Sequence, residues 1–467
     1  MTSALPAATF RDPAATFRDP AGSLSFEDDL VVRRVDVSAR SVVLALLESP
    51  FCRTLQERGE LIGAEVDDSG SVLRLRHPKI PIPTYPWEWT PSQWLAAAEL
   101  TLSLCEEALA NGWILKDATP LNVLFTATRP IFVDILSFER RDPHSSIWLA
   151  YGQYVRTFLL PLLMNRMLTW PLSLSLFKRD GYEPADCYAA LGWGQRLSRD
   201  AFWPITLPTL LDRRKNSETP SRKRPLRIAD PEVTASVLKR TLKNLRQRTR
   251  GAIPESVASD WSRYQGTLTH YTPEESRHKV DWVHRTLDAA HPERVLDIGA
   301  NTGEFSALAA GMGAEVVAIE RDMASADRIF RMARERNLSI QTIHADIARP
   351  TPAVGWNNAE SVALLPRLEA QFDLVMLLAV IHHLLLMEQI PLPAILDLCH
   401  RLSQKHLIIE WVPVEDPMFR SLMRGRDSLY GSLSEADLLA ACTDRFSMID
   451  RYALKNGRVL FHFEKIG

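Results

Sequence analysis

Clustered and alternating apolar positions divide the chain into two regions with different patterns. From about residue 256, short apolar runs predict strands at 294–298, 315–319, 340–344, 372–378 and 405–410. Amphipathic segments between these runs predict helices, notably one at 323–336. Strands that alternate with helices indicate a doubly wound α/β sheet. The chain closes with two strand-like runs joined by Asn456-Gly457, which predicts a terminal hairpin.

The first half of the chain has short strand-like runs at 30–35 and 72–78 and a helix-like stretch near 41–58. A long helix is expected next. Thr90 is its predicted N-cap, and Gln93, three residues later, completes a capping box. Apolar residues at helical spacing follow as far as Asn111-Gly112, which predicts the end of the helix. These elements indicate an α+β domain.

The stretch 157–177 is the most apolar part of the chain. Asn165 and Arg166 lie in its middle, and Pro161 and Pro171 interrupt it. A membrane-spanning helix needs about 20 consecutive, predominantly apolar residues, and charges within it are rare. The stretch therefore predicts buried helices of a soluble domain, with a membrane-edge segment as the alternative. No membrane span is expected.

Two segments differ from their surroundings. PAATFRD occurs at 6–12 and again at 13–19, so residues 1–23 are expected to form a flexible arm. Residues 212–250 hold 13 Lys/Arg against 4 Asp/Glu, and their second half is a basic helix candidate. This segment predicts a solvated linker with a surface helix, or a docking face for an acidic partner or an anionic substrate. The expected domains are therefore 24–211 and 256–467, joined by a basic linker and helix at 212–255.

Composition narrows the possible functions. The 467 residues include 55 Lys+Arg and 57 Asp+Glu, so a formal charge of −2 gives no global basic excess. Nucleic acid and anionic membranes are therefore not expected as partners. The five cysteines form no C-x-x-C pair and are odd in number, which argues against a zinc ribbon and a disulfide framework. A cytoplasmic setting fits best, because the first residues also lack the pattern of a secretory signal. No metal site is expected.

The most informative stretch is VLDIGANTGEFS at 295–306. A buried strand ends in Asp297, and Gly299 and Gly303 then allow a tight turn close to a ligand. Seventeen residues after Gly303, a second strand ends in Glu320, whose carboxylate can accept both hydroxyls of a ribose. Asp346 ends a third strand, near where an adenine amine would lie. The alternative is that the glycines only make a turn. The loop has neither the G-x-G-x-x-G form of NAD sites nor the G-K-[ST] of a P-loop.

With these motifs, residues 256–467 resemble the class I S-adenosylmethionine-dependent methyltransferases. The D-x-G-x-N-x-G loop, the two strand-end acids and FDLVMLLAVIHHL at 372–384 carry the resemblance. It implies a Rossmann-like sheet with an antiparallel last strand, and S-adenosylmethionine as the cofactor. It also implies Glu320 at the ribose, Asp346 with Ile347 at the adenine, and Leu378 with Ala379 under the sulfonium. Around the methionine part it implies Asp297, Gly299, Ala300, Asn301 and Gly303.

Candidates for catalysis follow the fourth and fifth strands. Methyl transfer from a sulfonium needs alignment of donor and acceptor, and it needs a base only where the acceptor must lose a proton. His382 and His383 follow the fourth strand and Glu410 ends the fifth, so these three residues are the main candidates. Glu415 and Asp416 come next in the sequence, and Arg424 and Arg426 could hold an anionic acceptor. Each main candidate also has a structural explanation, as a core histidine that caps a helix or as a carboxylate bonded to backbone amides. No N-P-P-Y motif follows the fourth strand, so the usual signal for amino-group methylation of DNA bases is missing.

The first half resembles kinase-like phosphotransferases around their catalytic loop. LKDATPLNVLF at 115–125 places Asp117 and Asn122 five residues apart, and Asp134 follows twelve residues after Asn122. The resemblance implies that the first Asp positions an acceptor hydroxyl and that the other two residues hold magnesium. The chain lacks the preceding His, the Phe-Gly after Asp134 and a glycine-rich phosphate loop. We expect an inactive kinase-like domain, and the alternatives are an unrelated fold and a working phosphotransferase.

Both halves together resemble the nodulation host-specificity proteins of the NoeA type. YPWEWTPSQW, FVDILSFE and EWVPVEDPMF are among the segments that carry this resemblance. The expected function is methyl transfer from S-adenosylmethionine to an oxygen or nitrogen of a small-molecule or saccharide acceptor. The alternatives are a protein that binds the cofactor without turnover, and a phosphotransferase that acts through the N-terminal domain.

Overall fold

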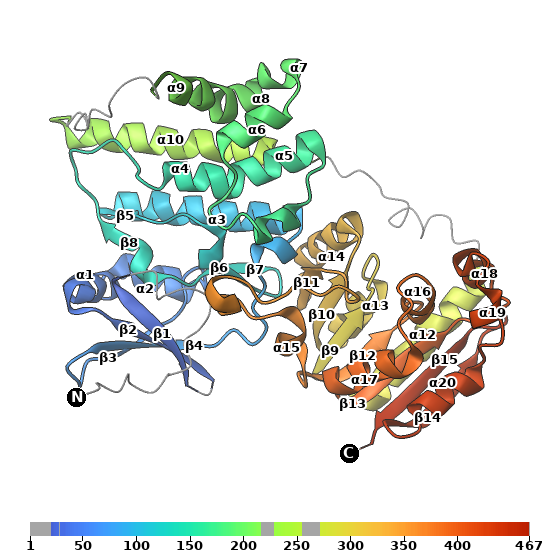
Figure 1. Ribbon diagram of the computed structural model, residues 1–467. Helices are drawn as coiled ribbons and strands as arrows, with labels where there is room; N and C mark the ends of the chain where they lie inside the picture. The colour runs from blue at the N-terminus through green and yellow to red at the C-terminus, as the bar shows by residue number, and fades with distance from the viewer. Residues whose placement is uncertain (1–19, 28, 216–227, 255–270, 467) are drawn as a thin grey trace, which may run out of the picture. The chain divides into compact units, whose positions relative to one another are not determined.

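The computed structural model describes residues 20–27, 29–215, 228–254 and 271–466 (Figure 1). The chain divides into two compact units, Met1–Glu255 with Ala353–Val362, and Ser256–Pro352 with Ala363–Gly467. The sequence placed 353–362 in the C-terminal domain. This segment instead belongs to the first unit, within which Glu360 pairs with Arg179. The duplicated heptapeptide lies outside the described residues, and the first strand already begins at Gly22, inside the predicted arm.

The first unit begins with an antiparallel sheet in the order β1-β2-β4-β3. Its strands are β1 (Gly22–Glu27), β2 (Leu30–Val35), β3 (Glu65–Asp67) and β4 (Leu73–Pro78). The helix-like stretch predicted near 41–58 forms two helices, α1 (Val37–Leu47) and α2 (Pro50–Glu57). Ser49 separates them: its side chain accepts a hydrogen bond from the Cys52 N–H and caps α2, and Pro50 takes the first turn.

The long helix α3 (Pro91–Ala110) confirms the predicted start and end. Thr90 and Gln93 form the capping box, and Asn111 is the C-cap. Short paired strands follow: β5 (Trp113–Leu115) with β8 (Phe138–Arg140), and β6 (Val123–Thr126) with β7 (Arg129–Phe132). The apolar stretch forms a π-helix (Val155–Leu159), α5 (Leu160–Leu168) and a 3-10 helix (Leu172–Leu176), with many buried side chains. Across the described residues, no helix has the length and apolar character needed to cross a membrane.

The helical part of the first unit also includes the basic helix α10 (Pro231–Gly251), which packs against α3. Arg246 Nη1 lies 2.9 Å from Glu106 Oε2, and Arg250 Nε lies 2.5 Å from Glu99 Oε1. Part of the basic charge is therefore neutralised within the unit. The other helices are α4 (Tyr151–Tyr154), α6 (Pro184–Ala190), α7 (Trp193–Arg196), α8 (Arg199–Ala201), a π-helix (Phe202–Thr206) and α9 (Leu207–Lys215).

The second unit is built on a seven-stranded sheet in the order β11-β10-β9-β12-β13-β15-β14. The first five strands in this order run parallel, and β15 is antiparallel to both of its neighbours. The predicted sheet strands and the terminal hairpin are confirmed. Their bounds are β9 (Arg294–Ile298), β10 (Glu315–Glu320), β11 (Ile340–His344), β12 (Phe372–Leu377), β13 (Ser403–Trp411), β14 (Phe446–Ala453) and β15 (Val459–Lys465).

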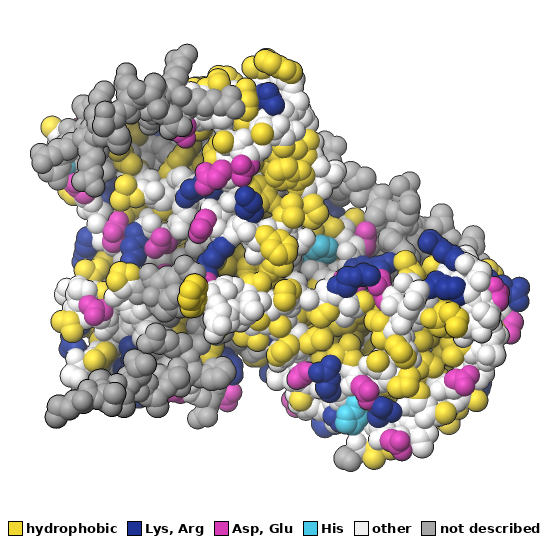
Figure 2. Space-filling view, viewed as in Figure 1, with side chains coloured by type: hydrophobic (Ala, Val, Ile, Leu, Met, Phe, Trp, Pro, Cys, Tyr) yellow, Lys and Arg dark blue, Asp and Glu magenta, His cyan; other side chains and the backbone are white. Residues whose placement is uncertain are grey.

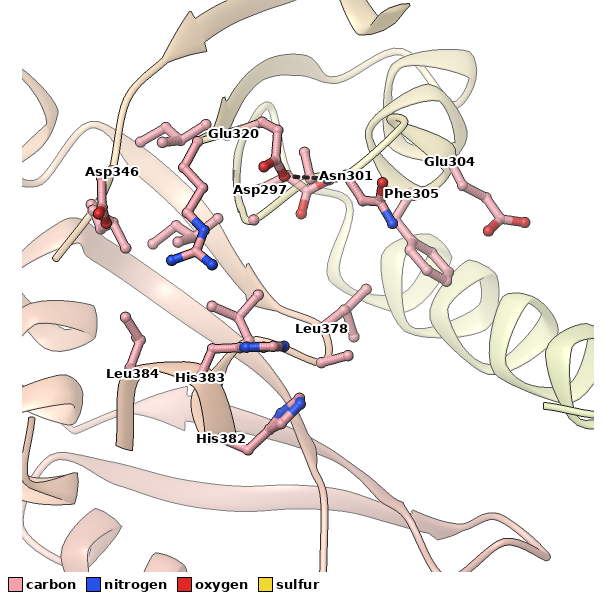
Figure 3. Close-up of a pocket in the computed structure, with 18 of the residues that line it drawn as sticks. Asp297, Asn301, Glu304, Phe305, Glu320, Asp346, Leu378, His382, His383 and Leu384 are labelled. Carbon is pink, nitrogen blue, oxygen red and sulfur yellow. Dashed lines mark hydrogen bonds between the residues drawn. The ribbon is translucent and has the colours of Figure 1, made fainter. Parts of the chain in front are cut away.

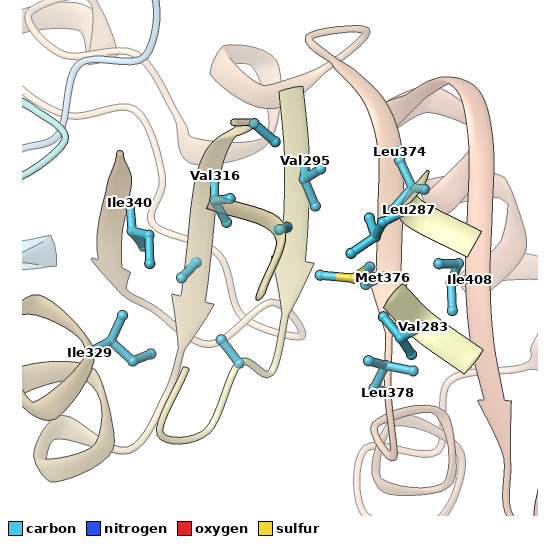
Figure 4. Packing of buried hydrophobic residues seen from close by; sticks show 14 of the residues in the cluster. Val283, Leu287, Val295, Val316, Ile329, Ile340, Leu374, Met376, Leu378 and Ile408 are labelled. Atoms are coloured by element: carbon cyan, nitrogen blue, oxygen red, sulfur yellow. The ribbon is translucent and has the colours of Figure 1, made fainter. Parts of the chain in front are cut away.

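A continuous apolar core holds the helices of the second unit on this sheet. Val295 of β9, Met376 of β12 and Ile408 of β13 pack with Val283 and Leu287 of the preceding helix (Figure 4). Each such side chain contributes about 1.5–3 kcal/mol when fully buried. The helices are α12 (Pro273–Ala290), α13 (Glu304–Gly311), α14 (Met323–Glu335), α15 (Leu364–Leu368), α16 (Ile381–Leu386), α17 (Leu392–Leu402), α18 (Pro417–Met423), α19 (Asp427–Tyr430) and α20 (Glu435–Cys442).

Charged side chains of both signs are interspersed on the visible face of the molecule (Figure 2). This distribution fits the formal charge of −2, and neither sign dominates that face. Since the parallel strands of the second unit point the same way, their carboxyl ends meet at one edge of the sheet. Ligands of open α/β sheets bind at this edge.

Candidate active site

The loop between β9 and α13 brings backbone rather than side chains to the carboxyl edge of the sheet. Gly299 and Gly303 have φ angles of 73° and 83°, in the left-handed region that favours glycine. A Cβ atom on Gly299 would lie only 2.4 Å from a methyl carbon of Val380. Any side chain there would therefore displace the loop that follows β12. Asn301, between the two glycines, also has a positive φ of 49°.

Glu320, at the end of β10, holds this loop in place. Its two carboxylate oxygens accept hydrogen bonds from the backbone N–H groups of Asn301 and Asp322, each at 2.7 Å. The side chain is almost fully buried, and burial raises the pKa of Glu320 although the two N–H groups oppose this shift. The carboxylate keeps lone pairs for further donors, because two oxygens offer about four acceptor sites. Figure 3 shows Glu320 beside Asn301 and Asp297.

The other two strand-end acids differ in their surroundings. Asp297 is buried and accepts a hydrogen bond of 2.6 Å from the Ser306 hydroxyl. Burial raises its pKa to about 6. Asp346, by contrast, is partly exposed and accepts a hydrogen bond from the Ala348 N–H at 2.9 Å. The two acids therefore differ in their access to solvent: Asp297 is buried, whereas Asp346 is partly exposed.

A single pocket joins these groups. Among the predicted residues it is lined by Asp297, Gly299, Ala300, Asn301, Glu320, Asp346, Ile347, Leu378, Ala379, His382 and His383. Two predicted residues do not line it. Gly303 instead lies at the start of α13, where a Cβ atom would crowd Ile329. Glu410 lies at the end of β13, behind side chains that do line the pocket.

The two histidines come from the start of α16, just past β12. Their rings are stacked at a tilt, with centroids 4.2 Å apart (Figure 3). His382 is 2% exposed, whereas His383 is partly exposed. Burial, with help from the charges of Arg321 and Arg458, lowers the pKa of His383 to about 4. His383 is therefore neutral at pH 7 and can accept a proton, although only as a weak base.

Glu410 is fully buried in a network of charged groups. Lys279 Nζ lies 2.6 Å from Glu410 Oε2, Arg458 Nη1 lies 3.4 Å from Oε1, and the Tyr271 hydroxyl donates to the same oxygen. Although burial opposes ionisation, the Lys279 and Arg458 charges hold the pKa of Glu410 below its ordinary value. A carboxylate so stabilised is a poor proton acceptor. The structure therefore favours a positioning role for Glu410 over the predicted role as a base.

The network contributes pocket residues that the sequence analysis missed. Tyr271, Lys279 and Arg458 line the pocket together with Phe305. Lys279 lies on α12, and Arg458 follows the hairpin turn, so they are 179 positions apart. No spacing rule connects such positions. Only Phe305 could have been predicted as a pocket residue from the sequence, because it directly follows the glycine loop.

The first unit holds the residues of the predicted kinase-like motif. Arg33 of β2 is 3% exposed, and its Nη1 lies 3.0 Å from Asp134 Oδ1. Ser137 Oγ donates to Asp134 Oδ2 at 2.5 Å, and Asn122 Nδ2 donates to the same hydroxyl at 3.0 Å. A guanidinium therefore occupies one side of Asp134, the residue expected to hold magnesium. Among the residues that the structure describes, no three His, Cys, Asp or Glu side chains are grouped so that they could hold a metal ion.

Comparison with known families identifies the second unit. Residues 268–413 match the model of a family described as a methyltransferase domain. These residues form a methyltransferase domain. The predicted class, an S-adenosylmethionine-dependent methyltransferase, is thereby confirmed, and the match spans the glycine loop, Glu320, Asp346 and both histidines.

The whole chain is also similar to a nodulation protein, NoeA of Rhizobium meliloti (strain 1021). The two are 28% identical over 478 residues, which cover 98% of this chain and 96% of NoeA. This relationship confirms the resemblance seen in the sequence.

Among solved structures, the N-methyltransferase NodS of Bradyrhizobium japonicum WM9 matches with a TM-score of 0.31 and 15% identity. The match covers 42% of this chain and 98% of NodS. Magnesium protoporphyrin IX methyltransferase of Synechocystis PCC 6803, with bound S-adenosylhomocysteine, matches with a TM-score of 0.31 and 18% identity. It covers 41% of this chain and 84% of that enzyme.

Proposed function

We propose that the methyltransferase domain transfers a methyl group from S-adenosylmethionine to an oxygen or nitrogen of a small-molecule or saccharide acceptor. The observation that carries this proposal is the pocket wall formed by the glycine loop and Glu320. The same cavity is lined by the backbone of the glycine loop, by the buried Glu320 carboxylate with its unused acceptor sites, and by the partly exposed Asp346. This order fits the methionine, ribose and adenine parts of the cofactor in turn.

In this proposal, some pocket residues bind the cofactor and others face the acceptor. Gly299, Ala300 and Asn301 would hold the methionine part, Glu320 the ribose hydroxyls, and Asp346 with Ile347 the adenine. Leu378 and Ala379 would line the region of the sulfonium. The cofactor supplies an activated methyl group when bound. The chain therefore has to align the acceptor atom with that group and exclude water from it.

The acceptor side of the pocket would contain His382 and His383. A hydroxyl or a neutral amine gives up a proton when its lone pair takes the methyl group, and a neutral imidazole within hydrogen-bond reach can take that proton. Glu410 would act indirectly, because it fixes Tyr271, Lys279 and Arg458 rather than contacting the acceptor.

Incubation of the full chain with methyl-labelled S-adenosylmethionine and a small-molecule cell extract tests the proposal. Transfer of label to an extract component that depends on the chain would support it. The matched control is Gly299→Val, whose side chain would clash with Val380 and close the cradle. If the wild-type chain binds S-adenosylhomocysteine but labels nothing in any extract fraction, the chain is a cofactor-binding protein without turnover.

A further inference from the structure

A buried lysine lies at the end of the pocket that is formed by the glycine loop. In the view of Figure 3, Asp346 and Phe305 lie at opposite ends of the row of labelled acids and loop residues, and Glu320 lies between them. Lys279 of α12 also lines the pocket, and its Nζ lies 4.9 Å from the centre of the Phe305 ring. Phe305 belongs to the first turn of α13, directly after the loop. This distance therefore places the ammonium group of Lys279 beside the glycine loop and away from Asp346.

The ammonium group of Lys279 is fixed by one carboxylate and has donors left for a ligand. Nζ donates to Glu410 Oε2 at 2.6 Å, and Glu410 itself does not line the pocket. An ammonium has three N–H donors, and Glu410 takes one of them. The rings of Tyr271 and Phe305, with centres 5.2 and 4.9 Å from Nζ, face the cation but offer no strong hydrogen-bond acceptor. The side chain is only 9% exposed, so a charged ligand oxygen is the partner that best satisfies the other donors.

A hydroxyl group projects from the same face of α12. Ser276 and Lys279 are three residues apart on this helix, so their side chains are neighbours on its surface. Both side chains line the pocket. An ammonium and a hydroxyl side by side can donate to the two oxygens of one carboxylate.

The charges around Lys279 favour a ligand group with no net charge. Glu410 also lies 3.4 Å from Arg458, and Arg458 lies 2.9 Å from Asp416, so two cations already face two carboxylates. A lone anion would add an unpaired charge to this buried site, which is costly. The amino-acid head group of S-adenosylmethionine carries a carboxylate and an ammonium group together. It therefore brings the charged oxygens that Lys279 lacks without disturbing the balance.

We propose that Lys279, together with Ser276, binds the carboxylate of the methionine part of the cofactor, so that this subsite selects ligands with a complete amino-acid head group. Glu410 is then a positioning residue, because it holds the ammonium group of Lys279 without lining the pocket. The inference rests on the proposed function, since it concerns the methyl donor of that reaction. It assigns the cation beside the glycine loop to the donor and not to the acceptor.

A comparison of two ligands tests this inference on the wild-type chain. Decarboxylated S-adenosylhomocysteine keeps the adenosine, the sulfur and the amino group of the parent compound and lacks only its carboxylate. In calorimetric titrations of the full chain, S-adenosylhomocysteine should bind about ten- to a hundredfold more tightly, the range for one hydrogen bond between charged groups. Equal affinities overturn the inference while leaving cofactor binding intact. If neither ligand binds, the proposed function fails together with the inference.

Variants show whether the preference comes from Lys279. Lys279→Met removes the ammonium group and keeps most of the length of the side chain. Its preference for S-adenosylhomocysteine should fall to within about threefold, whereas its affinity for the decarboxylated ligand should stay close to that of the wild type. The matched control is Lys455→Met, at an exposed pair with Glu274, which should keep the full preference. Equal losses for both ligands in Lys279→Met would indicate a merely structural role and overturn the inference.

A second variant covers the case in which Lys279→Met does not fold. The single change leaves the buried Glu410 with one cation fewer, and a broken buried pair is strongly destabilising. Lys279→Met combined with Glu410→Gln removes one charge of each sign and so keeps the balance of the network. This double variant should unfold cooperatively on heating and should also have lost the preference for S-adenosylhomocysteine. A folded double variant that retains the wild-type preference contradicts the inference.

Discussion

The role of Glu320 can be tested by Glu320→Gln, which keeps the shape of the side chain and removes its charge. In the wild type the carboxylate accepts two backbone N–H groups at 2.7 Å and has acceptor sites left for ribose hydroxyls. A hydrogen bond to a charged group contributes about 1.5–3 kcal/mol. Loss of the charge should therefore weaken S-adenosylhomocysteine binding by about ten- to a hundredfold, since 1.4 kcal/mol corresponds to about tenfold.

Stability must be measured alongside affinity, because the same carboxylate organises the glycine loop. A glutamine has one acceptor oxygen, so one of the two N–H groups loses its partner, which costs about 1–3 kcal/mol. Relief of a buried charge offsets part of this cost, since burial disfavours the ionised form of Glu320. We therefore expect only a modest fall in the melting temperature of the unliganded chain.

Calorimetric titration with S-adenosylhomocysteine and thermal unfolding measure the two effects. Glu315→Gln is the matched control, because Glu315 begins the same strand and its side chain is 69% exposed beside Arg294. This control should bind like the wild type. If Glu320→Gln also binds S-adenosylhomocysteine within about twofold of the wild type, the carboxylate does not hold the ribose and the assignment of the pocket fails.

Three further predictions concern other residues. The folded pKa of Asp297, about 6, lies above its ordinary value of 3.8, so stability of the unliganded chain should fall as the pH rises from about 4 to 6 and stay level above. Chemical unfolding of Asp297→Asn should show this dependence reduced by up to about 3 kcal/mol, and an unchanged pH profile would contradict the burial argument. Of His382→Ala and His383→Ala, one should lose about 10²–10⁴ in labelling rate with cofactor affinity retained, and normal rates in both would show that the acceptor needs no histidine base. Asp117→Asn should leave methyl transfer unchanged, whereas magnesium-dependent ATP turnover that is lost in this variant would show an active phosphotransferase.

Local patterns in the sequence predicted the sheet of the second unit well. Each parallel strand is a short apolar run, and an acid that lines the pocket lies at or just after the end of three of them: Asp297, Glu320 and Asp346. The glycine loop was also readable, because positive φ angles require particular residues. Such features depend on neighbours in the chain, so they can be inferred without knowledge of tertiary packing.

The features that the sequence did not predict depend on contacts between distant segments. Glu410 looked like a base because it ends a strand at the correct edge, but Lys279, 131 positions earlier, neutralises it. Arg458 is placed in the pocket only by the pairing of the terminal hairpin with β13. The basic helix α10 suggested an acidic partner, and two of its arginines meet Glu99 and Glu106 of their own unit. For Glu410 and for the two arginines of α10, the contacting residue lies more than 100 positions away in the sequence.

The origin of Arg458 in the terminal hairpin has a consequence for the biosynthesis of the protein. A ribosome releases the glycine loop and both histidines well before it reaches residue 458, so the nascent second unit first exists with Asp416 lacking its arginine and Glu410 paired with Lys279 alone. Its sheet at that stage ends at β13, with an open edge that β15 later covers. The charged network of Lys279, Glu410, Asp416 and Arg458 is therefore completed last, and a messenger truncated before the hairpin would encode a chain with the glycine loop and Glu320 but without this guanidinium.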